Sequence, residues 1–266
     1  MCLSTLSLEG VLANNKVESQ LHWTNSAWLG SGYFQLGEDE VFHVSVPSVF
    51  TLHRSGKIRY QLYTALSVGL RGFKIATLSP PREFSTLSLA PGLQVVYQPN
   101  ERWRLKPFVQ GGAGWDFSSH AESVGLTSLG LKSVYQSSIF GQKTTFGQQV
   151  VFSNYIPFSP VEGSSTDQQG PLFTVLNTGV ELKEFIAHRV GERFLDLNLY
   201  SIYTVFTPDL LRGVSHLSWM MSVGFNIGTQ STVPDHRSTL KMRGGLYYVF
   251  GDERLSGVRI NLGFPF

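Results

Sequence analysis

The sequence predicts an all-β chain that closes into an antiparallel transmembrane β-barrel of about twelve strands. Three observations lead to this fold class. The 266 residues include 13% aromatic residues and 27 glycines but only 15% charged residues, whereas soluble domains average about 25% charged. Long segments alternate apolar and polar residues, which gives an extended chain one apolar and one polar face. No apolar run reaches the ~18 residues of a transmembrane helix.

The alternation is clearest in six segments, and each is longer than the roughly five or six residues common in soluble sheets. These segments are residues 42–52, 58–71, 87–98, 104–117, 218–227 and 258–266. Weaker alternation predicts six more strands at 6–12, 131–140, 146–156, 172–183, 195–205 and 240–250. Residues 17–23 also alternate and are either a further strand or part of a loop. Most of these lengths suit the tilted strand of about 9–11 residues that crosses a bilayer.

The connections between these strands alternate in length through the first eight of them. The long ones are 13–40, 72–86, 118–130 and 157–171, and the short ones are 53–57, 99–102, 141–145 and 185–193. The pattern weakens in the last three, at 206–214, 228–238 and 251–254. Barrels of bacterial outer membranes have short periplasmic turns and longer outer loops. We therefore expect residues 1–266 to form one outer-membrane barrel domain with both termini in the periplasm; a soluble β-protein is the alternative.

The final segment keeps its alternation up to a phenylalanine. Its ending resembles the C-terminal signature of bacterial outer-membrane barrels, in which alternating apolar positions finish with an aromatic residue. The matched positions are Ile260, Leu262, Phe264 and Phe266. The resemblance implies that the outer-membrane barrel assembly machinery reads these residues. Pro265 departs from the commonest pattern, because proline offers no ladder N–H.

A narrower resemblance comes from the chain length, the strand number and the stretch RLKPFVQGGAGWDF at 104–117. Together they resemble the translocator barrel of autotransporters. In that family a passenger precedes the barrel, and a helix threads the lumen. Because only residues 1–5 precede the first expected strand, we expect a solitary barrel of this type, with no passenger and no room for a threading helix.

The polar faces of the strands are expected to line the lumen and to make it net positive. The expected lumen cations are Arg59, Arg71, Arg104, Lys106, Lys183, Lys241, Arg243 and Arg259, and the expected anions are Asp116, Glu181 and Asp196. Two functions stay open on this basis. One is a narrow, porin-like conduit for small solutes that favours anions. The other is a lumen filled by side chains that keeps the barrel rigid.

A catalytic alternative rests on the motif His-x-Ser, which occurs at 43–45 and at 216–218. Residues i and i+2 of a strand share a face, so a histidine can take the proton of the serine hydroxyl. Such a pair resembles the one that outer-membrane phospholipases and lipid A deacylases use. An outer-membrane lipid-acting hydrolase with His216 and Ser218 is therefore the alternative function. The sequence assigns no group that would orient the histidine, and we expect no enzymatic activity.

The remaining composition limits the partners. The net charge is +2, and no basic run of the kind that binds nucleic acid is present. We expect outer-membrane lipids and the assembly machinery as partners, and no cofactor or metal; the sequence does not fix the oligomeric state. Aromatic side chains that anchor barrels at the two membrane surfaces are expected at Trp103, Trp115, Trp219, Tyr247 and Tyr248.

Overall fold

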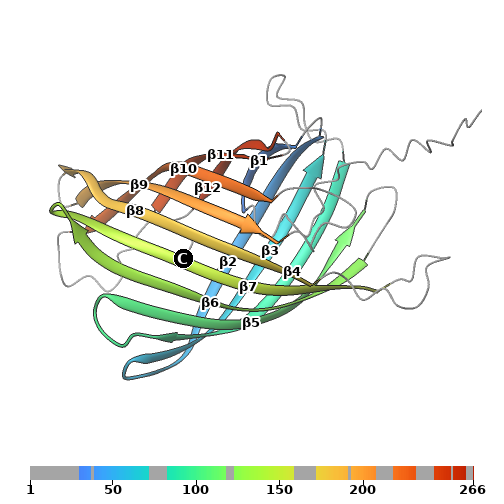
Figure 1. The fold of residues 1–266 in the computed structure, drawn as a ribbon, viewed down its shortest axis with the longest axis horizontal. Coiled ribbons are helices and arrows are strands. Elements are labelled where there is room, and N and C mark those ends of the chain that lie inside the picture. The colour runs from blue at the N-terminus through green and yellow to red at the C-terminus, as the bar shows by residue number, and fades with distance from the viewer. Residues whose placement is uncertain are drawn as a thin grey trace, which may run out of the picture.

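The structure, a computed structural model, confirms the predicted fold class. It describes residues 30–36, 39–71, 83–117, 123–158, 172–190, 193–207, 218–231, 243–252, 254–261 and 266. Each strand pairs in antiparallel fashion with its neighbours in the sequence, and β1 pairs with β12 to close the barrel (Figure 1). No helix in these ranges is long and apolar enough to cross a membrane.

The described residues form twelve strands. They are β1 (Gly32–Leu36), β2 (Asp39–Ser55), β3 (Ile58–Arg71), β4 (Glu83–Tyr97), β5 (Trp103–Asp116), β6 (Ser123–Ile139), β7 (Gln142–Pro157), β8 (Leu172–Val190), β9 (Arg193–Phe206), β10 (Trp219–Ser231), β11 (Arg243–Gly251) and β12 (Ser256–Asn261). The strands from β2 to β12 overlap the predicted segments, and several extend beyond them.

The first strand differs from the prediction. It is Gly32–Leu36, which lies within the segment 13–40 that was expected to be a long loop. The expected strand at 6–12 and the alternating residues 17–23 lie outside the described residues. Residues 1–31 precede β1, so the expectation that five residues precede the barrel is wrong. The expectation that there is no room for a threading helix rested on that number and loses its basis.

Because neighbouring strands run in opposite directions, the connections divide between two rims. The short-turn rim is where the odd-numbered strands begin and the even-numbered strands end, and its described turns are residues 56–57, 98–102 and 140–141. The long-loop rim is where the odd-numbered strands end and the even-numbered strands begin. The turn from β6 to β7 shows why the short turns are stable: Phe140 and Gly141 have φ angles of 51° and 80°, as a two-residue type I′ hairpin turn requires.

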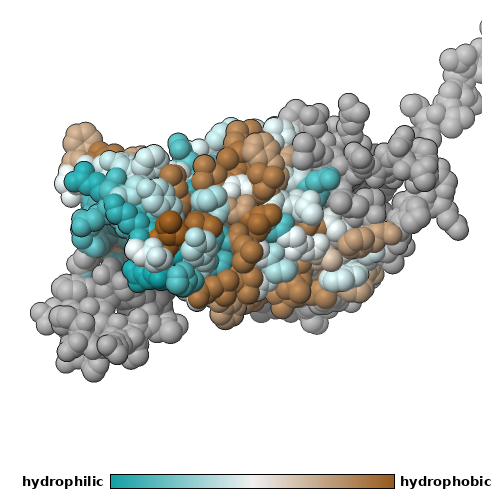
Figure 2. Space-filling view, turned by 90° about the horizontal axis from the view of Figure 1, so that it is seen from below, coloured by the Kyte–Doolittle hydropathy of each residue, from teal (hydrophilic) through white to brown (hydrophobic). Residues whose placement is uncertain are grey.

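Apolar side chains cover the middle of the outer surface. Val46, Leu93, Val109, Leu129 and Ile260 are each more than half exposed. Figure 2 shows an apolar region over the middle of one face and hydrophilic residues gathered at its left end. Exposure of so much apolar surface in water is unfavourable, and the arrangement suits a barrel surrounded by lipid.

Aromatic side chains lie near both ends of this apolar surface. Tyr60, Tyr97, Trp103 and Tyr135 are exposed near the short-turn rim. Near the long-loop rim, the rings of Trp219 and Phe250 pack edge to face, 6.3 Å apart. The expectation for Tyr247 is wrong, because its side chain is 1% exposed and lies inside. Consecutive strand residues point to opposite faces, so only its neighbour Tyr248 is exposed on the outer surface.

The β4–β5 ladder is interrupted on both strands. Pairing passes from Leu89–Ala113 to Gly92–Gln110, and the intervening step contains Pro91. A second gap, between Gln94–Phe108 and Tyr97–Leu105, contains Pro107. Proline donates no N–H to a ladder. A groove of about 570 Å³ hollows the outer surface beside Pro91 and is lined by Leu62, Leu93, Val109, Leu129 and Phe152.

The position of the apolar surface predicts a depth-dependent cost of charge. Leu129→Arg should lower the free energy of unfolding by about 2–4 kcal/mol, because the guanidinium would lie near the middle of the bilayer. Ile139→Arg is the matched control, since Ile139 shares that face and pairs with Gln142 directly before a turn; we expect about 0–1 kcal/mol. Urea unfolding of the bilayer-inserted protein measures both losses. Equal losses would show that the face or the height of β6 is misassigned.

Candidate functional site

Apolar side chains line the half of the lumen toward the long-loop rim. Phe34, Leu126, Phe173, Phe206 and Met220 are buried there and belong to one cluster, although they come from five strands around the barrel. The cluster runs from strand to strand around the wall, so the interior is apolar at this level. The expectation of a polar interior is therefore wrong for this half. An alternation pattern does not exclude apolar residues on both faces.

A luminal cavity of about 480 Å³ adjoins the apolar cluster. Strands around nearly the whole barrel contribute to it, so it lies in the lumen. Its polar lining includes Tyr63, Gln110, Lys106, Lys132 and Arg259. The Tyr63 hydroxyl donates a 2.6 Å hydrogen bond to Gln110 Oε1. The cavity volume falls in the range of about 300–1,000 Å³ that small-molecule sites occupy.

Four cations of β3, β5 and β6 repel one another along one wall. Lys106 lies opposite Lys132 in the β5–β6 register, and its charge is also repelled by those of Arg104 and Arg59. The Nζ atom of Lys132 lies 5.8 Å from the centre of the Phe108 ring, in a cation–π contact. The sequence analysis missed Lys132. The alternation could have identified it, because Lys132 lies between the outward-facing Leu131 and Ser133 and so points inward.

A polar network connects this wall to β8. Lys183 Nζ lies 3.9 Å from Oε2 of the buried Glu181. The Gln136 amide, turned so that its oxygen faces the cations, accepts hydrogen bonds from Lys183 Nζ at 3.3 Å and from Arg104 Nη2 at 3.1 Å. Asp196 is buried on β9. Cations and anions thus both occur in the interior toward the short-turn rim.

Arg259 of β12 lines the luminal cavity and packs closely against its neighbours. Its guanidinium lies against Gly30, where an added Cβ would be 2.6 Å from Nε, and 6.0 Å from the centre of the Tyr247 ring. Gly30 also has a φ of +72°, so a side chain there is excluded on both grounds.

The other residues expected to line the lumen remain predictions. Arg71 and Arg243 end β3 and begin β11, and Asp116 ends β5; the structure describes the backbone of these three. Lys241 lies outside the described residues.

The structure places Phe266 inside the barrel, so the expectation that it shares the outer face with Ile260 is wrong. Its ring packs against Tyr200, Ile202 and Tyr247. A Cβ built on Gly179 would lie 2.7 Å from Phe266 Cε2, and one built on Gly147 would lie closer still to the ring. Those two glycines leave the space that the ring fills. Leu262 and Phe264 lie outside the described residues, and the role of this segment as an assembly signal remains a prediction.

The His-x-Ser motifs are engaged in other contacts. His43 Nδ1 lies 2.7 Å from the Gly30 carbonyl oxygen, to which it donates. The Ser45 hydroxyl accepts from Ser67 Oγ at 3.1 Å. The Ser218 hydroxyl donates to the carboxylate of Asp252, as does its backbone N–H at 2.6 Å; His216 lies outside the described residues. In the described ranges, no three His, Cys, Asp or Glu side chains lie close enough to hold a metal ion.

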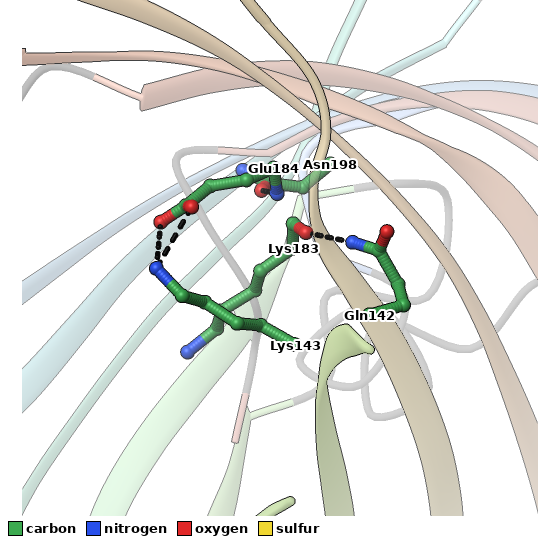
Figure 3. Close-up of polar contacts among 5 residues, drawn as sticks. All are labelled: Gln142, Lys143, Lys183, Glu184 and Asn198. Atoms are coloured by element: carbon green, nitrogen blue, oxygen red, sulfur yellow. Dashed lines mark hydrogen bonds and ion pairs between the residues drawn. The ribbon is translucent and has the colours of Figure 1, made fainter. Parts of the chain in front are cut away.

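A bulge in β8 shapes the short-turn rim beside the polar network (Figure 3). The register with β9 shifts between Leu182 and Ile186. Glu184 takes a φ of 53° there, and its N–H donates to Asn198 Oδ1 at 2.8 Å. Gln142 Nε2 donates to the Lys183 carbonyl oxygen. The bulge lies directly after Glu181, and it therefore sets the direction in which the Lys183 side chain projects from the strand.

A closed antiparallel barrel with an apolar outer surface is the architecture of transmembrane β-barrels. No protein-family model matches the chain, and no curated protein matches it. Among solved structures, the crystal structure of the beta domain of the Bordetella autotransporter BrkA is similar, with a TM-score of 0.55 and 10% sequence identity. The match covers 86% of this chain and 95% of that one. The predicted resemblance to an autotransporter barrel is confirmed for the fold.

The bulge provides a stability test. Asn198→Ala should lower the free energy of unfolding by about 1–3 kcal/mol, because the Glu184 N–H loses its acceptor. Lys143→Ala is the control: Lys143 pairs with Glu184 at 2.8 Å but is 65% exposed, and an exposed pair contributes about 0–1 kcal/mol. Urea unfolding compares the two variants. A larger loss for Lys143→Ala would show that the ion pair, and not Asn198, holds the bulge.

Proposed function

We propose that this protein is a bacterial outer-membrane barrel that is closed at one level of its lumen and binds small anions in the luminal cavity. The observation that carries the proposal is the position of the apolar cluster around Phe173 and Phe206 beside a cavity lined by Lys106, Lys132 and Arg259. The cluster blocks passage in this state, while the cations attract anions.

A position in the outer membrane suits both the closed backbone pairing and the outer face of the barrel. Within lipid every backbone N–H and C=O must pair internally, which a closed barrel achieves. The apolar middle and the aromatic side chains near both rims match the bilayer core and its two surfaces. We propose lipids as the partners of the outer face. The segment ending at Phe266 is the proposed signal for the assembly machinery, and the short-turn rim is the proposed periplasmic rim.

Between the two functions left open, the geometry supports the filled lumen. A conduit for small solutes would require the apolar side chains of Phe34, Phe173 and Phe206 to move apart. The lipid hydrolase gains no support, because His43 donates to Gly30 and Ser218 donates to Asp252. We propose that the protein is not an enzyme.

The proposed orientation predicts unequal labelling of two positions on intact cells. With Cys2→Ser as the background, Gly163→Cys in the connection from β7 to β8 should react with a membrane-impermeant maleimide. Gly56→Cys, in the turn from β2 to β3, should react only after the outer membrane is permeabilised. Quantified labelling before and after permeabilisation measures the difference. Labelling of Gly56→Cys on intact cells would reverse the orientation.

The closed lumen predicts the currents of the purified protein in planar bilayers. The unmodified barrel should pass little current. Phe173→Ala combined with Phe206→Ala should increase the current and favour chloride over potassium, because the block is removed and the cations remain. Adding Lys106→Glu and Lys132→Glu to that variant should abolish or reverse the preference.

Phe152→Ala, on the outer face, is the control for loss of a phenylalanine and should leave the current unchanged. Heat-dependent migration in SDS gels checks that each variant is folded. A large current through the unmodified barrel would contradict the closed lumen. A preference of the opened barrel for potassium would contradict the cationic cavity.

A further inference from the structure

The Phe266 ring occupies a shaped space in the wall of the lumen, which we call the ring slot and define by Gly147, Gly179, Tyr200, Ile202 and Tyr247. The three atoms nearest to a Cβ built on Gly147 all belong to Phe266. The rings of Tyr200 and Tyr247 lie 3.8 Å apart, measured between centres, and form the cluster against which Phe266 packs. A flat aromatic ring is thus held between a glycine surface and aromatic side chains, an arrangement that aromatic rings favour.

The ring slot opens on the luminal cavity and lies beside a cation. Phe266 and Ile202 line that cavity together with Arg259, Lys106 and Lys132. The Arg259 guanidinium carbon is 6.0 Å from the centre of the Tyr247 ring. Its Nε is buried and makes no hydrogen bond with any other described residue. A buried donor of this kind gains most from an acceptor, above all a charged one.

The wall near the ring slot also carries a negative charge. Glu181 follows Gly179 by two residues on β8 and therefore points to the same side. Its carboxylate is buried, and Lys183 Nζ lies 3.9 Å from it. Lys183 offsets the charge of Glu181, while Arg259, Lys106 and Lys132 remain on the cavity surface.

We propose that the lumen contains a binding site for an aromatic anion, in which the ring slot takes the aromatic ring and the cations of the cavity take the charge, and that Phe266 fills the ring slot from within the chain. A ligand of this class is a small carboxylate that carries a phenyl group. The proposal deepens the proposed function and rests on it in one respect: small anions reach the cavity from water.

The test uses the full chain, folded into detergent micelles, with Phe266→Ala to vacate the ring slot. The probe is 3-phenylpropionate, and its binding is measured by calorimetry. Propionate lacks the ring, and 3-phenylpropanol lacks the charge. We expect 3-phenylpropionate to bind at least about tenfold more tightly than propionate, because burying a ring contributes at least that much. It should also bind more tightly than 3-phenylpropanol, because only the carboxylate accepts charge-assisted hydrogen bonds from the cations. The unmodified protein, whose ring slot is full, should bind 3-phenylpropionate about tenfold more weakly. It also serves as the control for partition of 3-phenylpropionate into the detergent micelle.

A second substitution locates the bound ring. Gly147→Val added to Phe266→Ala should abolish the gain, since the valine fills the ring slot. Gly244→Val is the matched control, because a Cβ on Gly244 meets nothing within 4 Å. Retained binding with Gly147→Val would overturn the proposal. So would equal binding of 3-phenylpropionate and 3-phenylpropanol, which would show that the charge is not recognised.

The outcomes separate this proposal from the function on which it rests. Equal binding of 3-phenylpropionate and propionate would overturn the ring slot and leave the anion cavity standing. Binding of neither anion would overturn both. Tight binding of 3-phenylpropionate by a barrel that passes no current supports the ring slot and the closed lumen together.

The position of Phe266 is tested without any ligand. In the Cys2→Ser background, Gly147→Cys and Phe266→Cys should form a disulfide under mild oxidation. A Cβ on Gly147 would lie 2.9 Å from the Phe266 Cβ, and a small shift gives the roughly 3.8 Å that a disulfide requires. The pair Gly244→Cys and Phe266→Cys should not react. If the first pair stays reduced in the folded protein, Phe266 does not fill the ring slot.

Discussion

The pairing of β1 with β12 is the constraint on which the rest of the structure depends. It is a short ladder, from Gly32–Arg259 to Gln35–Ser256, yet it removes both edges of the sheet at once. Without it, two rows of backbone N–H and C=O groups would face lipid, where each unpaired group is costly. Closure also creates the interior: only a closed sheet gives Phe34 of the first strand an inner side on which it is fully buried.

Closure explains the division of the lumen into two environments. Apolar side chains are stable on the long-loop half of the inner wall because closure removes them from water. Charged side chains near the short-turn rim need partners. On β8, Glu181 and Lys183 lie near each other, and the bulge positions Lys183. The cavity lies between the two, where small residues such as Ser67, Ser88 and Ala90 line the wall together with long polar side chains.

The sequence predicted the fold well because lipid outside and a lumen inside impose a period of two on most strands. It failed where that period carries too little information. The segment GYFQL of β1 is five residues long, and a two-residue connection follows it, so nothing distinguished it from a loop. Tyr247 and Tyr248 are adjacent, and the pattern did not settle which one faces lipid. The position of Phe266 depends on Gly147 and Gly179, which are distant in sequence. The role of Lys132 depends on its position opposite Lys106 on the neighbouring strand.

The two prolines of the β4–β5 ladder have a consequence for how the barrel comes apart. A closed sheet has no edge from which to peel, so its opening must begin by parting two strands along their whole length. Pro91 and Pro107 remove N–H donors from one such seam, and the groove beside Pro91 removes side-chain packing from the same place. Backbone amides beside Pro91 and Pro107 should therefore exchange with solvent faster than those in the uninterrupted stretches of β4 and β5.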